Sequence, residues 1–385
     1  MFVHITKKIV EIIGENYYTY IKGIFTHKIN STVKALKDFE FYFDLPSPSH
    51  NNFISVVSHK YAPHLHYAIK CIPKYLLIKQ NLYNTIEMRD KVLTSVNYPF
   101  ILKYFKSFTE KNCIFCLKEY ISCININTLL QRHHSFIESI STNQIKAYMA
   151  TLLLACSFLH KKRIIYRNIS PDGVVLRDNG FLCLMNFDYS KRLTTPNEDY
   201  TCTKLGIPHY MSPEAITGER YSFDIDYWGI AVFVYQLAFG ELPFGKSHSE
   251  PMNVYFDIIN KEVSFPFKQE TSKATQNALQ NFQYLIRSML RKNRLLRLAR
   301  FEDIKRHDWF EEFNWDELEE MKTLPEYIPD IVTVGSSSNI ANMKSANGAY
   351  LRHFIDTMKD VSLIYLYETL TDKEKKGIDE WYKTF

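Results

Sequence analysis

The chain has 385 residues, of which 46% are hydrophobic and 23% charged, and its formal net charge is +5 at pH 7. This is an ordinary globular composition, and the length suits about two domains of roughly 150 residues each. The small positive charge does not by itself indicate a nucleic-acid-binding protein, and no nucleic-acid partner is expected. Seven scattered cysteines, an odd number, indicate a reducing compartment.

The start of the chain, MFVHITKKIVEIIGENYYTYIKGIF, does not have the pattern of a signal peptide, because lysines and glutamates interrupt any apolar core. No run in the chain approaches about 18 apolar residues, so no membrane span is predicted. Ile9, Ile12 and Ile13 repeat at helical spacing, which predicts an amphipathic helix packing on the body. A membrane-surface role for this helix is the alternative. We expect an intracellular, cytoplasmic protein, and a nuclear location remains open.

Strand patterns dominate from Phe39 to about Tyr120. The segment FISVVSHKYAPHLHYAIKCI has two β-branched apolar runs around a His/Pro/Lys turn, which predicts a hairpin. Apolar residues at helical spacing between Thr85 and Val96 predict one helix. Cys113 and Cys116 lie three residues apart in a predicted strand, so their sulfurs should point to opposite faces. We therefore expect two half-buried thiols and no metal or redox site.

Helix patterns dominate from Thr142 onward. The segments QIKAYMATLLLACSFLH and DYWGIAVFVYQLAFG are long and apolar, and RDNG between them predicts a tight turn joining two short strands. A small β-rich domain followed by a larger helical one predicts an α+β fold with two lobes. After Trp309 and Phe310 a tail begins, and its Ser/Asn/Gly-rich middle, TVGSSSNIANMKSANG, is typical of a mobile segment.

Five separated motifs follow one another in one order: YAIK, YRNISPDG, NFD, SPE and DYWG. They resemble the strand lysine, catalytic loop, Asp-Phe-Gly motif, Ala-Pro-Glu motif and central helix of protein kinases. Tyr166 before Arg167, the segments VNYPFI and RHDWF, and the aromatic C-terminal end resemble the AGC group. The similarity is to the catalytic subunit of cAMP-dependent protein kinases and runs from about Phe39 to Phe385.

The resemblance implies a bilobal protein kinase fold with a small β-rich N-lobe, a larger helical C-lobe and an AGC-type C-terminal tail. The implied boundaries are a helical extension at 1–38, a kinase domain at 39–310 divided into lobes at 39–120 and 121–310, and a tail at 311–385. Tyr382 and Phe385 match the terminal aromatics that fold back onto the small lobe in this group.

The structural positions of the family are present. The resemblance implies that Glu214 pairs with Arg297 and that Asp226 caps the catalytic-loop backbone. Four residues fall in the hydrophobic column of the family, and each is equally well explained as plain core: Leu93, Tyr104, Tyr166 and Phe187.

The chemical positions differ from the family pattern. Asn168 replaces the aspartate that accepts the substrate proton, and a neutral amide forfeits general-base help of roughly 10²–10⁴. Asn186 replaces the metal-binding aspartate, and Mg²⁺ prefers carboxylates. Gly173 replaces the asparagine that holds a second metal, and Ser170 replaces a phosphate-binding lysine. Mg²⁺ binding is therefore not expected, although Asp188 could stand in as a metal ligand.

The nucleotide positions are altered too. If ATP binds, the resemblance implies contacts from a set of five residues: Lys70, Ala68, Glu119, Ile121 and Val175. Pro46, Pro48 and Asn51 stand at the three glycine positions of the phosphate loop, and proline has no N–H to offer. Arg89 stands at the position of the glutamate that pairs with Lys70, and Lys118 lies just before the hinge. These three cations would repel one another. Either the pocket takes a metal-free nucleotide or anion, or Arg89 and Lys118 turn outward and it stays empty.

The partner surfaces differ as well. Thr203 aligns with the activation-segment phosphothreonine, with Arg167 and Lys191 placed to receive a phosphate, although an ordinary exposed threonine is an equal alternative. Asn125 and Gln236 replace substrate-reading acids and leave Asp172, so specificity for basic substrates is doubtful. Cys202 replaces the tryptophan that binds regulatory subunits, and Ile207 replaces a threonine. The basic run 287–300 is expected to be a solvated helix face with one structural arginine, and an acidic docking site is the alternative.

These observations favour a pseudokinase, monomeric outside its complexes, that serves as a scaffold or allosteric partner of kinases, kinase regulators or anchors. The first alternative is a weak or unconventional serine/threonine kinase that uses Lys70 and Asp188. The second is a competitor that occupies kinase regulators or anchors. Fold alone does not decide among them.

Overall fold

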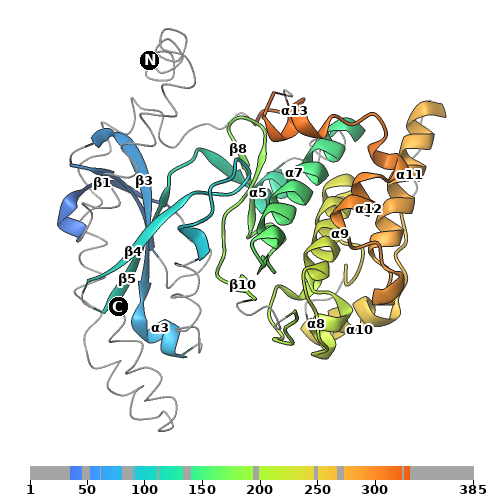
Figure 1. The fold of residues 1–385 in the computed structure, drawn as a ribbon, viewed down its shortest axis with the longest axis horizontal. Helices are drawn as coiled ribbons and strands as arrows, with labels where there is room; N and C mark the ends of the chain where they lie inside the picture. Colours follow the sequence, from blue (N-terminus) through green and yellow to red (C-terminus); the bar gives the residue numbers. More distant parts are fainter. Residues whose placement is uncertain are drawn as a thin grey trace. The chain divides into compact units, whose positions relative to one another are not determined.

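The computed structural model describes residues 35–45, 53–60, 62–79, 90, 92–110, 112–132, 140–193, 199–246, 250–266, 273–322 and 325–329. The chain forms two compact units, a β-rich one and a helical one (Figure 1). The predicted α+β class is confirmed. No helix within these ranges combines the length and apolar character needed to cross a membrane. The phosphate loop, Arg89, the first 34 residues and the tail from residue 330 onward lie outside the described residues.

The β-rich unit is built on a five-stranded antiparallel sheet. Its strands lie in the order β1 (Phe39–Leu45), β2 (Phe53–His59), β3 (Ala62–Pro73), β5 (Cys113–Glu119) and β4 (Tyr104–Glu110). The predicted hairpin is the β2–β3 pair, in which Val56 opposes Ala68 and Ile54 opposes Lys70. A short 3₁₀ turn (Leu36–Asp38) precedes β1, and α3 (Lys74–Lys79) follows β3. Of the helix predicted over 85–96, only Asp90, Val92 and Leu93 are described as helical.

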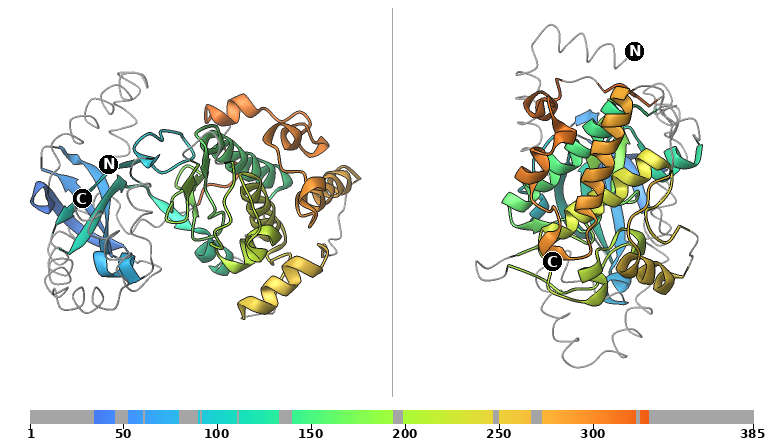
Figure 2. Two further views of the ribbon diagram at one scale, coloured as in Figure 1. Left: turned by 60° about the horizontal axis from the view of Figure 1, so that its bottom comes forward. Right: turned by 90° about the vertical axis from the view of Figure 1, so that its right-hand side faces the viewer.

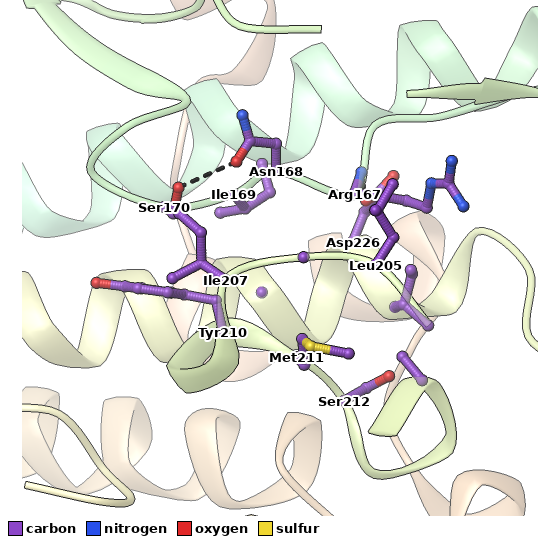
Figure 3. A pocket seen from close by; sticks show the side chains of 14 residues that line it. Arg167, Asn168, Ile169, Ser170, Leu205, Ile207, Tyr210, Met211, Ser212 and Asp226 are labelled. Atoms are coloured by element: carbon purple, nitrogen blue, oxygen red, sulfur yellow. Dashed lines mark hydrogen bonds between the residues drawn. The ribbon is translucent and has the colours of Figure 1, made fainter. Parts of the chain in front are cut away.

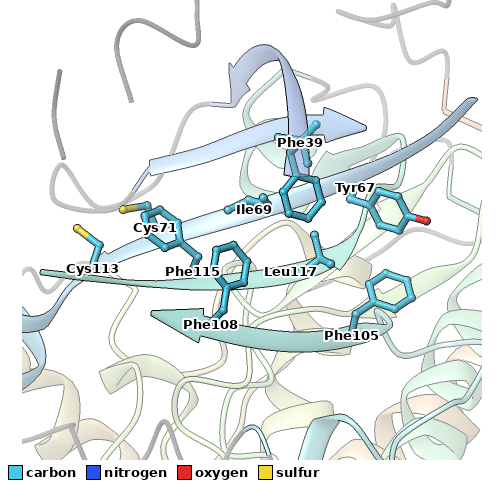
Figure 4. Packing of buried hydrophobic residues seen from close by; sticks show 10 residues of the cluster. Phe39, Tyr67, Ile69, Cys71, Phe105, Phe108, Cys113, Phe115 and Leu117 are labelled. Carbon is cyan, nitrogen blue, oxygen red and sulfur yellow. The ribbon is translucent and has the colours of Figure 1, made fainter. Parts of the chain in front are cut away.

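One face of this sheet carries a buried apolar cluster, in which aromatic rings from β1, β4 and β5 surround Ile69 and Cys71 of β3 (Figure 4). The prediction of half-buried thiols is wrong, because Cys113 and Cys116 are both completely buried. The two cysteine side chains do point to opposite faces of the sheet. Cys113 pairs with Pro73 and Cys116 with Lys70, and residues three apart in a strand face opposite sides. Contact with Cys113, reinforced by burial, raises the pKa of Cys71, so this thiol stays protonated and unreactive at neutral pH.

The helical unit is centred on α7 (Thr142–Lys161) and α9 (Asp224–Phe239), which lie side by side in Figures 1 and 2. Both helices match the long apolar segments of the sequence. Ser141 caps α7 by accepting the N–H of Gln144, and α9 ends at Gly240, whose φ of 73° is left-handed. The remaining helices surround this pair: α5 (Ile126–Arg132), α8 (Pro213–Thr217), α10 (Pro251–Asn260), α11 (Lys273–Met289), α12 (Phe301–Lys305) and α13 (Trp315–Glu319).

Short strands carry the loops of this unit. Strands β6 (Cys123–Asn125), β8 (Val174–Arg177) and β9 (Leu182–Leu184) form one sheet, and β7 (Ile164–Ile165) pairs with β10 (Lys191–Arg192). The predicted RDNG turn joins β8 to β9, and Gly180 has the positive φ of 81° that such a turn favours. The segment Asn97–Leu102 belongs to this unit, because the Leu102 N–H donates to the Leu184 carbonyl at 2.8 Å.

Candidate active-site region

The loop Tyr166–Gly173 is held from below by one buried carboxylate. Asp226 accepts the backbone N–H of Tyr166 at 2.9 Å and of Arg167 at 2.8 Å, and His160 Nε2 lies 2.8 Å from its Oδ2. Three hydrogen bonds compensate the burial of this charge. They also fix Arg167 in a left-handed backbone conformation with φ of 62°. Asp226 therefore holds the start of the loop, at Tyr166 and Arg167, in a defined shape.

Both polar atoms of the Asn168 side chain are used inside the protein. The residue is 2% exposed; its Nδ2 donates to the Asn186 carbonyl at 2.9 Å and its Oδ1 accepts from Ser170 Oγ at 3.2 Å. Figure 3 shows the second of these bonds. A neutral amide in this setting is a structural tie between the loop and the segment after β9. It has no basicity with which to accept a proton.

At Gly173 the loop leaves no room for a side chain. A Cβ atom there would lie 1.9 Å from the Asn168 carbonyl oxygen and 2.7 Å from Tyr166 Oη. Tyr166 Oη also donates to the Gly173 carbonyl at 2.6 Å, which draws the loop together. The position from which the family's asparagine would reach a metal is thus filled by the loop itself.

Asn186 and Asp188 lie in the turn after β9. The backbone N–H of Asp188 donates to Asn186 Oδ1 at 3.4 Å, and Phe187 between them packs edge-on against Tyr166 with ring centroids 4.9 Å apart. Burial raises the pKa of Tyr189, and the negative charges of Asp188 and Asp172 raise it further. Carboxylate charge is therefore present near the turn, but it lies two residues beyond the position where the family places it.

The donor set does not fit Mg²⁺. A neutral amide, Asn186, and a glycine, Gly173, stand at the two metal positions that the resemblance implies, whereas Mg²⁺ selects carboxylates. Within the described ranges, one group of three close metal-ligating side chains exists, namely Cys156, His160 and Asp226. In that group Asp226 is committed to the loop N–H groups, so it is part of the framework.

A cavity of about 20 Å³ lies behind the loop, lined by Asn168, Ser170, Ile207, Met211 and Ser212 among others (Figure 3). This volume is about what one water molecule needs. Ser212 Oγ is buried and has no hydrogen-bond partner in the part of the chain that the structure describes. Ile207, at the position of the family's threonine, makes one wall of the cavity apolar. A cavity of this size and lining has no room for a substrate group.

The nucleotide positions are divided between the two units. Lys70 and Ala68 lie on one face of β3, where Cys116 and Lys118 of β5 oppose them directly. Lys70 and Lys118 are thus diagonal neighbours on one face of the sheet. Lys70 is 8% exposed. Glu119 and Ile121 belong to the same unit, whereas Val175 is buried in β8 of the other.

The activation-segment residues are brought together around Tyr221. Arg167 donates to Tyr221 Oη at 3.0 Å, and this hydroxyl donates to the Thr203 carbonyl at 2.6 Å. Lys191 Nζ donates to Thr201 Oγ1, which lies 3.2 Å from Thr203 Oγ1. Thr203 is exposed, and Arg167 and Lys191 are the two basic residues of this group. No local sequence pattern indicates Tyr221, because its contacts with Arg167 and Thr203 depend on tertiary structure.

Glu214 and Arg297 form a buried bidentate ion pair, with N–O distances of 2.6 and 2.9 Å. The prediction that the basic run 287–300 forms one solvated helix face with one structural arginine is wrong. Helix α11 ends at Met289, and a second arginine, Arg294, forms an ion pair with Asp224 at the surface. Because the chain leaves the helix after Met289, Arg294 lies at the surface whereas Arg297 is buried.

Lys292 in this run was not singled out by the sequence, yet it is half-buried. Its Nζ lies 3.6 Å from the Phe244 ring centroid and has no hydrogen-bond partner among the described residues. Burial lowers its pKa to about 8, with Glu262 opposing the shift and Arg297 adding to it. The Phe244 and Trp228 rings attract the charged amine, but this attraction is weaker than the hydration that burial removes, so the pKa falls.

We expect the folded protein to gain stability as pH rises from about 8 to about 10.5, because there the unfolded chain binds a proton at Lys292 that the folded chain has released. Lys292→Met should raise the melting temperature at pH 7 by a few degrees, on the order of 2–4 °C per kcal/mol regained. The gain should shrink as pH increases through this range. Melting curves of both proteins from pH 7 to 10 measure this difference. A gain that is constant with pH would contradict the assignment.

Comparison with known proteins agrees with this geometry. The model of the protein kinase domain matches residues 54–310. The cAMP-dependent protein kinase catalytic subunit of Dictyostelium discoideum is 27% identical over 278 residues, which cover 71% of this chain and 40% of that protein. The cAMP-dependent protein kinase type 3 of Saccharomyces cerevisiae is 28% identical over 258 residues, covering 66% of this chain and 60% of that protein.

A cGMP-dependent protein kinase of Plasmodium berghei is 27% identical over 255 residues, or 66% of this chain and 28% of that protein. The chain thus spans less than two thirds of the length of these relatives. The domain match covers well over half of the chain, in agreement with the β-rich and helical units and with the order of the five motifs. The chain belongs to the protein kinase family and is of AGC-like type.

Proposed function

We propose that this kinase-family chain is a pseudokinase, which transfers phosphoryl groups weakly or not at all and acts as a scaffold or allosteric partner. The observation that carries the proposal is the internal use of Asn168, whose amide is bonded to Asn186 on one side and to Ser170 on the other. A group that must orient a substrate hydroxyl is poorly suited to that task when its nitrogen and its oxygen are both already bonded inside the protein. In this chain that side chain closes the loop.

The metal positions support the same proposal. Phosphoryl transfer requires cations that neutralise the charge developing on the phosphate. The oxygen of Asn186 accepts a backbone N–H in its own turn, and Gly173 has neither a side chain nor space for one. These losses affect positioning and charge neutralisation separately, so regaining one function would leave the other missing.

The substrate surface supports a partner role without basic-substrate specificity. Asn125 Nδ2 donates to the Pro171 carbonyl at 3.2 Å, and Gln236 Oε1 accepts from Tyr210 Oη at 2.5 Å. Each amide therefore makes an internal contact where the family has an acid for the substrate. Because the relatives are cAMP- and cGMP-dependent kinases, we infer that the partners are other kinases, kinase regulators or anchors. A protein that competes with active kinases for such regulators or anchors would be a pseudokinase of this kind and would differ only in its partner.

A weakly active serine/threonine kinase is the second candidate, and one observation favours it. Burial is the main cause that raises the pKa of Tyr189, and the charges of Asp188 and Asp172 raise it further, so two carboxylates lie near the turn. In this alternative Lys70 would hold the nucleotide and Asp188 a metal ion.

Thermal melting with ATP, with Mg²⁺ and with both separates these candidates. A ligand of the folded state stabilises it by about 2.7 kcal/mol at 100 times its dissociation constant, so binding raises the midpoint. We expect no stabilisation that depends on Mg²⁺. A shift with ATP alone would indicate a metal-free nucleotide held through Lys70, and it should disappear in Lys70→Met.

Two variants sharpen this test. Asn186→Asp supplies the missing carboxylate and serves as a positive control for a Mg²⁺-dependent shift. Asp188→Asn should leave the wild-type melting pattern unchanged if no metal binds there. A Mg²⁺-dependent shift in the wild type that is lost in Asp188→Asn, together with transfer of labelled phosphate to a protein substrate, would establish the alternative and refute the pseudokinase proposal.

A further inference from the structure

Helix α10 carries an apolar stripe on its outer side. Met252 is 73% exposed, Phe256 62% and Ile259 37%, although all three are large hydrophobic residues. Steps of four and three residues place them on one side of the helix. Single exposed apolar side chains are ordinary, but a contiguous row of them marks a surface that contacts another molecule.

The opposite side of α10 is anchored in the helical unit. Val254 and Ile258 are fully buried, and a Cβ atom on Gly245 would lie 3.1 Å from the Val254 side chain. The helix lies beside α8 at the edge of the unit (Figure 1). The stripe is therefore presented by a rigid element, so its docking costs little ordering entropy.

The surface around the stripe carries little charge. The helix itself contains no basic residue and one acid, Asp257, which is buried and paired with Lys261 at 2.8 Å. Asn253 and Asn260 are exposed and border the stripe on one side, while Lys204 lies over an aromatic ring of the helix. Anionic lipid surfaces and nucleic acids bind through clusters of lysine and arginine. A row of apolar residues at helical spacing instead matches a second amphipathic helix.

The two ends of α10 carry opposite charges. Glu250 precedes the helix and is exposed, and Lys261 follows it with a side chain that is 60% exposed. If a second copy of α10 lies antiparallel about a two-fold axis through its middle, Glu250 of each copy meets Lys261 of the other. Contacts between two identical surfaces are reciprocal in this way. The same register pairs the apolar and aromatic positions: Met252 with Ile259, and Tyr255 with Phe256.

A second acid at the same end does not cancel this pattern. Glu262 follows Lys261 but lies near Lys292 of its own chain, since burial lowers the pKa of Lys292 and the charge of Glu262 opposes that shift. With Asp257, the two acids and two lysines of this end balance one another. Lys261 is the exposed cation among them, so it is the one that a glutamate of a second copy can reach.

We propose that α10 joins two copies of this chain in a weak antiparallel dimer, in which the apolar stripes face each other. A standard interface buries about 800 Å² per partner, and one short helix offers less than that. We therefore expect a dissociation constant of roughly 10–100 µM. Below that concentration the chain is a monomer, as expected from the sequence. This contact is independent of phosphoryl transfer, because none of its residues belongs to the loop Tyr166–Gly173.

Sedimentation equilibrium of the full chain from about 1 to about 300 µM measures this association. We expect the average mass to rise toward twice that of the chain. Phe256→Ser should weaken the dimer about tenfold or more, because it removes the central aromatic side chain of the contact. Leu295→Ser is the matched control, since Leu295 is 93% exposed on the turn after α11 and its loss should leave the dimer unchanged.

Charge reversal at the two ends of α10 tests the antiparallel register. Glu250→Lys and Lys261→Glu should each weaken the dimer about tenfold, because both symmetry-related pairs become repulsive. An equimolar mixture of the two variants should regain an affinity close to that of the wild type, since every pair then joins a lysine to a glutamate. Energy transfer between donor-labelled and acceptor-labelled variants measures this mixed dimer. Melting curves show whether each variant is folded.

Three results would overturn the proposal. The first is a wild-type mass that stays that of the monomer over this range, which would leave the stripe to a different protein. The second is equal weakening by Phe256→Ser and Leu295→Ser, which would indicate general adhesion between apolar surfaces. The third is a mixture of the charge variants that associates no better than either alone. If Lys261→Glu does not fold, Phe256→Ser and Leu295→Ser still decide the question.

Discussion

Arg297→Met is expected to lower the free energy of unfolding by about 3–5 kcal/mol, because it leaves one buried carboxylate without its counter-charge. The Glu214 side chain is 3% exposed and the Arg297 side chain fully buried. Arg297 also donates to the Arg291 carbonyl at 2.9 Å, and its guanidinium lies 4.8 Å from the Trp228 ring centroid. The loss corresponds to a fall in melting temperature of about 10 °C at roughly 2–4 °C per kcal/mol.

Arg294→Met is the matched control, since Arg294 pairs with Asp224 at the surface and its side chain is 40% exposed. Surface ion pairs contribute about 0–1 kcal/mol, so this variant should melt close to the wild type. The double variant Glu214→Gln/Arg297→Met should be more stable than Arg297→Met alone, because it no longer buries a lone charge. If Arg297→Met and Arg294→Met melt at the same temperature, the buried pair is not what stabilises this region.

Residues that form local patterns were predictable from the sequence. The apolar runs of α7 and α9 and the RDNG turn are encoded by neighbouring residues, and all three are present. The contact between Glu214 and Arg297 was also expected, although 83 positions separate them. That expectation rested on the resemblance to kinases, since no pattern within one segment indicates a pair so far apart.

The errors arose where tertiary packing decides. Cys113 and Cys116 were expected to be half-buried, but both faces of β5 are covered, so alternation did not indicate exposure. The basic run after α11 was expected to follow one helix, but the chain turns after Met289 and directs Arg297 inward. Charge alone does not distinguish a solvated arginine from a paired one.

The losses at the chemical positions were visible in the sequence, but their structural consequence was not. The residue types show that Asn168 cannot act as a base and that Gly173 cannot bind a metal. They do not show that Asn168 bonds to Asn186 and Ser170, or that the loop backbone fills the space beside Gly173. These contacts depend on the path of the loop around Asp226, which no local sequence pattern encodes.

Restoring the family residue at position 173 should therefore damage the protein rather than repair it. Gly173→Asn would place its Cβ atom 1.9 Å from the Asn168 carbonyl oxygen, a backbone atom that cannot move without breaking the loop. We expect a loss of about 1–3 kcal/mol or more from overpacking, and no gain of phosphoryl transfer. Urea unfolding and a phosphate-transfer assay on the same preparation measure both outcomes.

Two further variants separate the steric cost from other effects. Gly173→Ala should reproduce most of the loss, because the clash begins at the Cβ atom. Gly218→Ala is the control for backbone strain, since its φ is 77° but no atom lies within 4 Å of its Cβ position. That control should cost about 1 kcal/mol. If Gly173→Ala is as stable as the wild type, the loop opens readily, and its closed arrangement around Asn168 no longer supports the pseudokinase proposal.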